Sequence, residues 1–411
     1  MTQVPRAFTV TVVAPPPPGS LPSWIASMAL WEWKQVPLQG GAAALSNVYP
    51  DKPFGALPAL VGSDLPQNVS DSEGVDSIFY GWGGLAVTPE GDVYAWGGGH
   101  RNYAGNEVYR LRLNDGGATP YWQRLSNPPI WSQVGVSNNP PDYHYNLDNP
   151  PTPVSCHSYY SYGVSGSKLF LLGGAAAFGI GFASRCELDV FNIPANINVA
   201  GGTWTINQEP DSQFQTGNPV GKWHVVRDPF TANVYAVSKT YGSQARFGQI
   251  NTTTNRWTEL GRVNETRGIW NAAAFDGNRK RIINCGNGDN VQLPISYWQI
   301  GGGGGTFSLT GPNVFEFESA GNDPFFTYAY DPSGIDCLLR KTFTGRTIYR
   351  MDGAGNQPYN CYEQATTGVL PTDAYRGKGG GGARFQYIQS LKGCIYIPWF
   401  GHEVFFLRTS L

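Results

Sequence analysis

Short apolar stretches alternate with tight polar turns along most of the chain, and this alternation recurs as a unit. Each unit has a small or apolar strand, a turn rich in Gly, Asp, Asn or Pro, and a second apolar strand. Apolar runs bounded by such turns predict β-hairpins. The unit occurs six times, as GGLAVTPEGDVYAW from Gly83, SYYSYGVSGSKLFLLGG from Ser158, HVVRDPFTANVYAV from His224, NAAAFDGNRKRIINCG from Asn271, TYAYDPSGIDCLL from Thr327 and FQYIQSLKGCIYIPW from Phe385.

A third and a fourth strand, each with an aromatic residue, follow each of the first five hairpins. Three of these aromatic pairs are 13 residues apart by subtraction: Tyr109 and Trp122, Phe191 and Trp204, Tyr349 and Tyr362. Four strands in a unit of roughly fifty residues are typical of a β-propeller blade. The pattern therefore predicts an all-β fold, a six-bladed β-propeller, and the repeat count does not support a seven-bladed ring.

The sixth unit has a third strand, EVFFLRTSL, but no fourth strand after it. Residues 30–37, LWEWKQVP, carry the fourth-strand pattern and lie before the first complete unit. We therefore predict that the N-terminal strand closes the last blade, with Trp31 to Val36 paired to the C-terminal strand. Such pairing removes an exposed sheet edge, which would otherwise invite aggregation.

The predicted organisation is an N-terminal arm followed by one propeller domain over residues 21–411. Residues 1–20 form the arm, because RAFTVTVV alternates like a strand and APPPPGS extends stiffly as polyproline II. An apolar strand on a rigid spacer suits strand addition to a partner protein. The expected blades span about residues 79–126, 155–208, 222–261, 268–310, 322–366, and 383–408 together with 30–37.

Glycine doublets after two of the second strands carry a resemblance to a known family. They stand in YAWGGGH, at Gly97 to Gly99, and in FLLGGA, at Gly173 and Gly174, and the aromatic pairs follow them. In these features the chain resembles the kelch-repeat β-propellers, which include the central domain of galactose-oxidase-like proteins. The resemblance covers nearly all of residues 30–408, although only the first two units keep the doublet.

Composition narrows the classes of partner. Charged residues make up 14% of the chain and the formal net charge is −2, so no basic surface for nucleic acid is expected. No apolar run is long enough for membrane insertion. The six cysteines form no CxxC pair, which argues against a zinc site and favours buried thiols, with one disulfide between neighbouring blades as the alternative.

The long loops between blades, together with the second-to-third-strand loops, lie on one face of the predicted ring. Function on a rigid scaffold is usually carried by such loops, so we place the binding surface there. Aromatic rings with neutral hydrogen-bonding groups suit carbohydrate. The expected binding residues are Trp82, His100, Arg101, Tyr103, His157, Trp223, His224, Trp270, Asn271, Asn287, Asp289, Arg384 and His402.

The sequence shows no recognisable set of catalytic residues. No Cys stands in a context that matches the Cys–Tyr crosslink of copper radical oxidases, and the candidate acids sit mostly in turn sequences such as FDGN and DPSG. We therefore predict no catalytic residues, no metal and no cofactor.

These observations favour a non-enzymatic binding propeller in a larger assembly. The predicted protein is a phage tail or baseplate component of the virion. It joins other virion proteins through residues 1–20, contacts a host-surface glycan or protein, and is part of an oligomeric assembly. Three alternatives stay open: a sugar-processing enzyme (an epimerase, lyase or oxidase) with His157, His224 and Arg384 around the channel, a protein-binding kelch adaptor, and an extracellular or cell-surface location.

Overall fold

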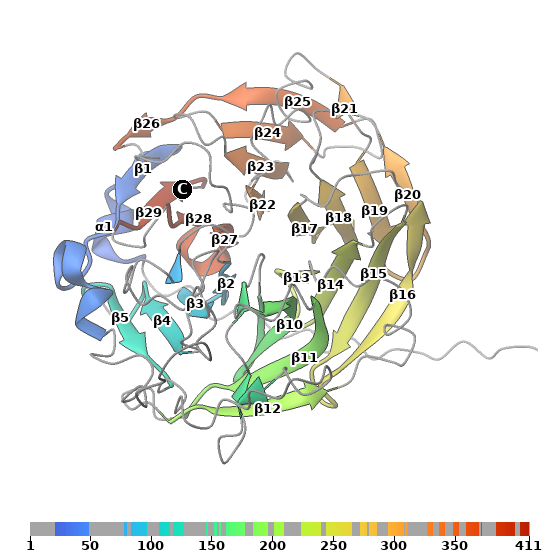
Figure 1. Ribbon diagram of the computed structural model, residues 1–411. Coiled ribbons are helices and arrows are strands. Elements are labelled where there is room, and N and C mark those ends of the chain that lie inside the picture. The colour runs from blue at the N-terminus through green and yellow to red at the C-terminus, as the bar shows by residue number, and fades with distance from the viewer. Residues whose placement is uncertain are drawn as a thin grey trace, which may run out of the picture.

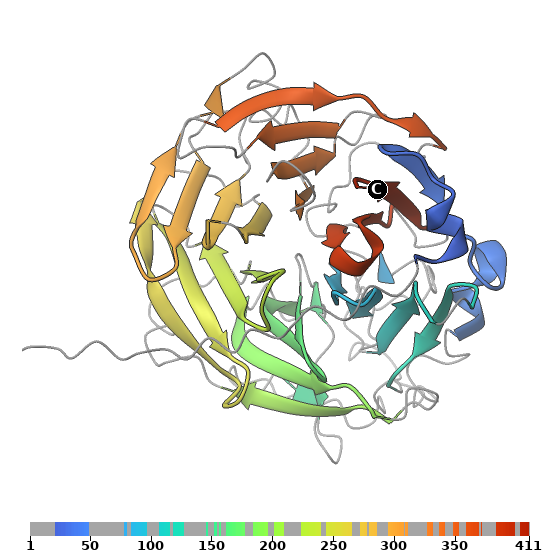
Figure 2. The same ribbon diagram turned by 180° about the vertical axis from the view of Figure 1, so that it is seen from behind.

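The chain is an all-β propeller, seen along its axis from opposite sides in Figures 1 and 2. The predicted arm, residues 1–20, lies outside the described residues. The computed structural model describes residues 21–48, 78–79, 84–96, 107–115, 118–126, 145–146, 152–153, 156–157, 162–176, 184–195, 201–208, 223–239, 244–264, 272–277, 279–285, 295–307, 309–310, 327–331, 337–341, 348–352, 359–369, 371, 384–398 and 403–410.

The described strands form six sheets of four or five strands and one separate pair. The first sheet contains β2 (Ala86–Val87), β3 (Asp92–Trp96), β4 (Val108–Arg112) and β5 (Tyr121–Arg124). The second contains β8 (Cys156–His157), β9 (Gly163–Ser165), β10 (Lys168–Ala176), β11 (Ser184–Asn192) and β12 (Thr203–Gln208). The third contains β13 (Trp223–Arg227), β14 (Val234–Lys239), β15 (Gln244–Asn251) and β16 (Arg256–Asn264).

The other three sheets continue around the ring. The fourth sheet contains β17 (Ala272–Asp276), β18 (Arg281–Cys285), β19 (Ile295–Gln299) and β20 (Gly304–Phe307). The fifth contains β22 (Thr327–Asp331), β23 (Cys337–Lys341), β24 (Ile348–Asp352), β25 (Tyr359–Gln364) and β21 (Leu309–Thr310). The last contains β27 (Phe385–Ile388), β28 (Gly393–Tyr396), β29 (Phe405–Arg408), β1 (Glu32–Gln35) and β26 (Thr367–Gly368). The separate pair is β6 (Tyr145–Asn146) with β7 (Thr152–Pro153). In the described residues the helical segments are α1 (Ser23–Ala26) and three short 3-10 turns, Gly41–Ala43, Ser46–Val48 and Gln389–Leu391.

The aromatic pairs read from the sequence lie on neighbouring strands, but their register varies. Phe191 stands directly opposite Trp204, with ring centroids 5.0 Å apart. Tyr109 instead pairs with Arg124, and Trp122 pairs with Leu111. The equal spacing of 13 residues therefore does not fix which residues face each other, because turn geometry also sets register.

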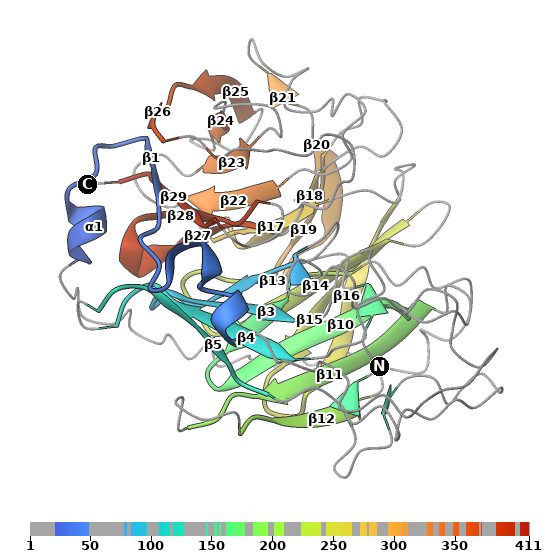
Figure 3. The same ribbon diagram turned by 60° about the vertical axis from the view of Figure 1, so that its left-hand side comes forward.

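The predicted N-terminal closure is confirmed. β1 pairs antiparallel with β29, with Trp33 opposite Leu407, and Figure 1 shows the blue N-terminal strand beside the red C-terminal one. Arg408 adds a second tie, because its guanidinium donates to the carbonyl oxygens of Ile25, Ala26 and Met28. In Figure 3, α1 accordingly lies at the periphery, next to the sheet that contains β1 and β29.

Two short parallel strands link neighbouring sheets in a way that the sequence did not predict. The chain leaves β20 and adds β21 to the outer edge of the sheet that contains β25. It leaves β25 and adds β26 to the outer side of β1. Each addition covers part of an outer strand edge, where unpaired backbone groups would otherwise be exposed.

The hydrophobic core lies between neighbouring sheets rather than in the channel. One cluster joins Tyr94 and Val108 of the β2–β5 sheet to Leu169 and Phe191 of the next sheet. Equivalent clusters fill the following two gaps between sheets and the closing gap, in which α1 also packs. This arrangement explains why strands such as β28 and β29 are buried on both faces.

Within the part of the chain that the structure describes, no helix is long and apolar enough to cross a membrane. Two of the six cysteines, Cys361 and Cys394, are described as buried. This matches the expectation of buried thiols at these two positions.

Candidate functional site

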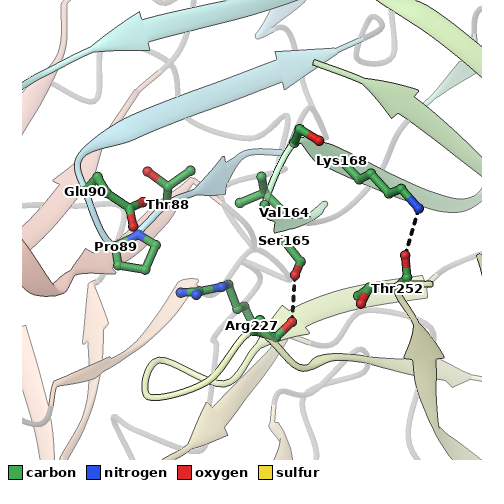
Figure 4. Close-up of a pocket in the computed structure, with 11 residues that line it drawn as sticks. Thr88, Pro89, Glu90, Val164, Ser165, Lys168, Arg227 and Thr252 are labelled. Atoms are coloured by element: carbon green, nitrogen blue, oxygen red, sulfur yellow. Dashed lines mark hydrogen bonds between the residues drawn. The ribbon is translucent and has the colours of Figure 1, made fainter. Parts of the chain in front are cut away.

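A pocket of about 530 Å³ opens where the turns of three consecutive sheets meet (Figure 4). This volume is within the range of about 300–1,000 Å³ that is typical of small-molecule sites. Three walls come from the β2–β3, β9–β10 and β13–β14 turns, and Thr252 of the β15–β16 connection completes the lining, so we call it the three-turn pocket. The lining residues are Thr88, Pro89, Glu90, Val164, Ser165, Gly166, Ser167, Lys168, Arg227, Ala232 and Thr252.

The first wall is the tight turn between β2 and β3. The backbone N–H of Asp92 donates to Thr88 Oγ1 at 3.1 Å, and Gly91 has a φ of +109°, which a residue with a side chain rarely adopts. The backbone N–H of Ser390, from the last sheet, donates to Pro89 O at 3.0 Å. The turn is thus fixed from both sides, and it presents the exposed Glu90 side chain at the rim.

The second wall is the β9–β10 turn, VSGSK. Gly166 has a φ of +56° and leaves open space around it, while Val164 beneath it is buried. Ser165 Oγ donates to Ala232 O at 2.8 Å, and this bond joins the second wall to the third wall, the β13–β14 turn. The neighbouring Ser167 is exposed at the rim.

Lys168 lines the pocket, but its ammonium group is already bound. Its Nζ donates to Thr252 O and to Asn255 Oδ1, each at 2.8 Å. In Figure 4 the side chain runs away from Glu90, toward Thr252. Lys168 therefore braces the β15–β16 turn with two of its three donors, and it adds positive charge to the pocket.

Arg227 is the last residue of β13, and Figure 4 shows its guanidinium extending toward Pro89 and Glu90. Burial lowers the pKa of Arg227, although the negative charges of Glu90 and Asp228 act in the opposite direction. Arginine still keeps its proton at ordinary pH. The pocket thus contains a permanent positive charge that has lost part of its hydration.

The acidic neighbour of Arg227 is engaged elsewhere. Asp228 Oδ1 accepts from the backbone N–H of Phe230 at 2.9 Å, and Asp228 Oδ2 accepts from Lys280 Nζ at 3.2 Å. Among the described residues, no hydrogen bond or ion pair holds the Arg227 guanidinium, and its Nε is buried without an acceptor. The arrangement therefore provides a partly desolvated donor group at a cavity, which suits the recognition of an anionic or hydrogen-bond-accepting ligand.

Most of the residues expected to bind a ligand have side chains outside the described part of the structure. Described only by their backbone are His157 in β8 and Trp223 in β13. Outside the described residues are Trp82, His100, Arg101, Tyr103, Trp270, Asn271, Asn287, Asp289 and His402. Their predicted role stays a prediction.

The two remaining candidates, His224 and Arg384, are buried side chains with exposed fractions of 0% and 1%. Arg384 Nη1 donates to Phe79 O at 2.6 Å and to Pro398 O at 3.3 Å. Arg384 therefore ties the start of β27 to a distant backbone segment. Neither side chain reaches the three-turn pocket.

Sequence reasoning missed the pocket because it placed the binding surface on the other face of the ring. First-to-second-strand turns and third-to-fourth-strand loops share one face, and the pocket is built from them. Their residues suggested only turn structure. One available signal was the charge of the turns themselves, since Glu90, Lys168 and Arg227 each adjoin one.

No candidate metal centre was found in the described parts of the chain, where no three His, Cys, Asp or Glu side chains come together. No protein-family model and no curated protein matches the sequence. Among solved structures, a "Structure of YjhT" has 10% identity and a TM-score of 0.48, over 79% of this chain and 93% of that chain.

Two further solved structures are similar over comparable lengths. A "Structure of Dos1 propeller" has 13% identity and a TM-score of 0.41, over 79% of this chain and 67% of that one. A "Streptogramin B lyase structure" has 10% identity and a TM-score of 0.41, over 81% and 95%. These likenesses concern the fold alone.

Proposed function

We propose that this chain is a binding propeller whose three-turn pocket takes part of a saccharide, and that it serves in a larger assembly, a phage tail or baseplate that contacts host-surface glycan. The observation that carries the binding role is the pocket itself, in which short braced turns surround a cavity of about 530 Å³. Rigid walls favour binding, because little conformational entropy is lost when a ligand enters.

The chemistry of the walls suits a saccharide. Pro89, Val164 and Ala232 provide apolar surface for C–H groups, while Ser167, Glu90 and Arg227 provide groups that can orient hydroxyls. Ligand sites commonly combine a largely apolar lining with a few polar groups that fix orientation.

We also propose that the fold comprises six blades of kelch type. Support for the count comes from the six sheets of four or five strands. Support for the kelch type comes from the doublet Gly173 and Gly174, which lies within β10 beside an irregularity in its pairing with β11.

The assembly role belongs to the same proposal and rests on the sequence. Residues 1–20 are proposed to join other virion proteins by strand addition, and the virion is the proposed location. A chain without residues 1–20 is expected to keep glycan binding and to lose incorporation into the assembly.

A glycan array and isothermal titration calorimetry with the full chain test the binding role. Ser167→Trp places a large side chain at the rim and is expected to abolish saccharide binding. The matched control is Thr258→Trp, because Thr258 is exposed on the outer strand β16 and does not line the pocket. Both variants should melt within a few degrees of the wild type.

Each outcome has a definite reading. Binding that survives in the control and disappears in Ser167→Trp supports the proposal. Absence of binding to every saccharide and to intact bacterial cells overturns the proposal. Equal saccharide binding by both variants shows that the pocket is not the binding site. Chemical conversion of a bound sugar during the titration would replace the binding role by the sugar-processing enzyme.

A further inference from the structure

The charged groups of the three-turn pocket differ in how many hydrogen-bond and ion-pair partners they have, and this difference indicates the chemical class of the ligand. Lys168 Nζ is held by Thr252 O and Asn255 Oδ1, and Asp228 is held by Phe230 N and Lys280 Nζ. In the described part of the chain, Arg227 has no equivalent hydrogen-bond or ion-pair partner. A ligand that enters the pocket therefore meets the guanidinium as the cationic group whose donors are least engaged.

A charge that has lost hydration gains most from a partner of opposite charge. Removing an ion from water is costly unless it is paired and hydrogen-bonded. Burial already lowers the pKa of Arg227, because its charged form is partly desolvated. A ligand anion would restore the lost interactions, and a neutral hydroxyl would do so less well.

The net charge of the lining distinguishes between classes of anion. One carboxylate, Glu90, and two cations, Lys168 and Arg227, line the pocket, so its formal charge is +1. A single negative charge neutralises it, whereas a phosphate with nearly two charges would leave excess negative charge beside Glu90. A carboxylate also matches the planar fork of a guanidinium, with two parallel hydrogen bonds.

We infer that the pocket binds an acidic saccharide through its carboxylate, which pairs with Arg227, while Glu90 and Ser167 contact the sugar hydroxyls. The inference rests on the proposed saccharide-binding function and adds the class of sugar. It assigns Arg227 as the residue that determines specificity for the acid.

Calorimetry on the full chain with three probes tests the inference: glucuronate, its neutral methyl ester, and glucose 6-phosphate. We expect glucuronate to bind roughly 10- to 100-fold more tightly than the ester, the range for hydrogen bonds that involve a charged group. The phosphate ester should bind more weakly than glucuronate. Because the ester differs only at the carboxylate, this comparison needs no mutant.

Two variants test the residue assignments, because they should change the affinity for glucuronate in opposite directions. Arg227→Gln should bring the affinity for glucuronate down to that of the ester, whereas Glu90→Gln should raise it, because a repelling charge is removed. Arg262→Gln is the matched control, since Arg262 is an arginine of the outer strand β16 that is paired with Glu259. It should leave the preference for the acid unchanged.

Failure of this inference can be distinguished from failure of the proposed function. Equal affinities for glucuronate and its methyl ester overturn the inference and leave a neutral saccharide as ligand. A preference for the acid that persists in Arg227→Gln overturns the assignment of Arg227, and tighter binding of the phosphate overturns the choice of carboxylate. Absence of binding to any saccharide overturns the proposed function itself.

Discussion

The clearest stability prediction concerns Trp33, the aromatic residue of the strand that closes the ring. Its exposed fraction is 1%, and its ring lies 6.0 Å from that of Phe385 and 6.3 Å from that of Tyr396. It stands opposite Leu407 on β29 and Gly368 on β26. Trp33→Ala therefore removes packing from the junction that holds the two ends of the chain together.

The magnitude follows from burial and from the indole N–H. An aromatic side chain buries 150–250 Å², which at about 25 cal/mol per Å² gives roughly 4–6 kcal/mol. Among the described residues no acceptor meets the buried Trp33 Nε1, and such a donor costs about 1–3 kcal/mol. We therefore expect Trp33→Ala to lower the free energy of unfolding by about 3 kcal/mol. Trp33→Phe should cost much less, because it keeps most of the buried aromatic surface and, like Ala, removes the unsatisfied donor.

Urea unfolding followed by circular dichroism measures the loss, and limited proteolysis shows whether residues 21–36 are released before the ring unfolds. Gln35→Ala is the control, because Gln35 is exposed on the same strand and should change stability by no more than about 0.5 kcal/mol. If Trp33→Ala unfolds and is cleaved like the Gln35→Ala control, the closing strand does not stabilise the ring in the way described.

Two further predictions concern packing and pH. Gly248→Ala should cost about 1–3 kcal/mol, because a Cβ there would overlap the ring of Trp257; Gly303→Ala, where a Cβ meets nothing within 4 Å, is the control, and equal urea midpoints would contradict the packing argument. Burial raises the pKa of Tyr235 to about 12, so between pH 10 and 12 the unfolded chain loses a proton that the folded chain keeps, and stability falls by roughly 3 kcal/mol at most. Tyr235→Phe keeps the ring that stacks 4.8 Å from Phe275 and should remove this part of the alkaline loss, so identical alkaline unfolding curves for the two proteins would refute it.

Local pattern was sufficient to predict the hairpins and the closing strand. The turn sequences TPEGD and VSGSK lie between β2 and β3 and between β9 and β10, where the alternation places them. The LWEWKQVP segment pairs with the C-terminal strand because the last sheet would otherwise have lacked an outer strand. Both inferences depend on hydrogen bonding and alternation, which a strand records in its own sequence.

The candidate site could not be predicted in the same way. Glu90, Ser165 and Arg227 come from three different sheets, and each looks locally like an ordinary turn or strand-end residue. Lys280 and Lys168 illustrate the same difficulty, because both adjoin turns, yet only Lys168 lines the pocket and both are bound to acceptors from another sheet. Whether a charged side chain has a hydrogen-bond or ion-pair partner depends on contacts between residues far apart in the chain.

The sequence by itself thus determined the all-β propeller and the pairing of its ends, since alternation, turn residues and a missing fourth strand are local or countable properties. Only the tertiary structure decided that His224 and Arg384 are buried, that short parallel strands link neighbouring sheets, and that Arg227 faces a cavity with its donors available. The physical reason is that burial and charge satisfaction arise between sheets, where the ring geometry brings separate turns together, and no single stretch of sequence records those distances.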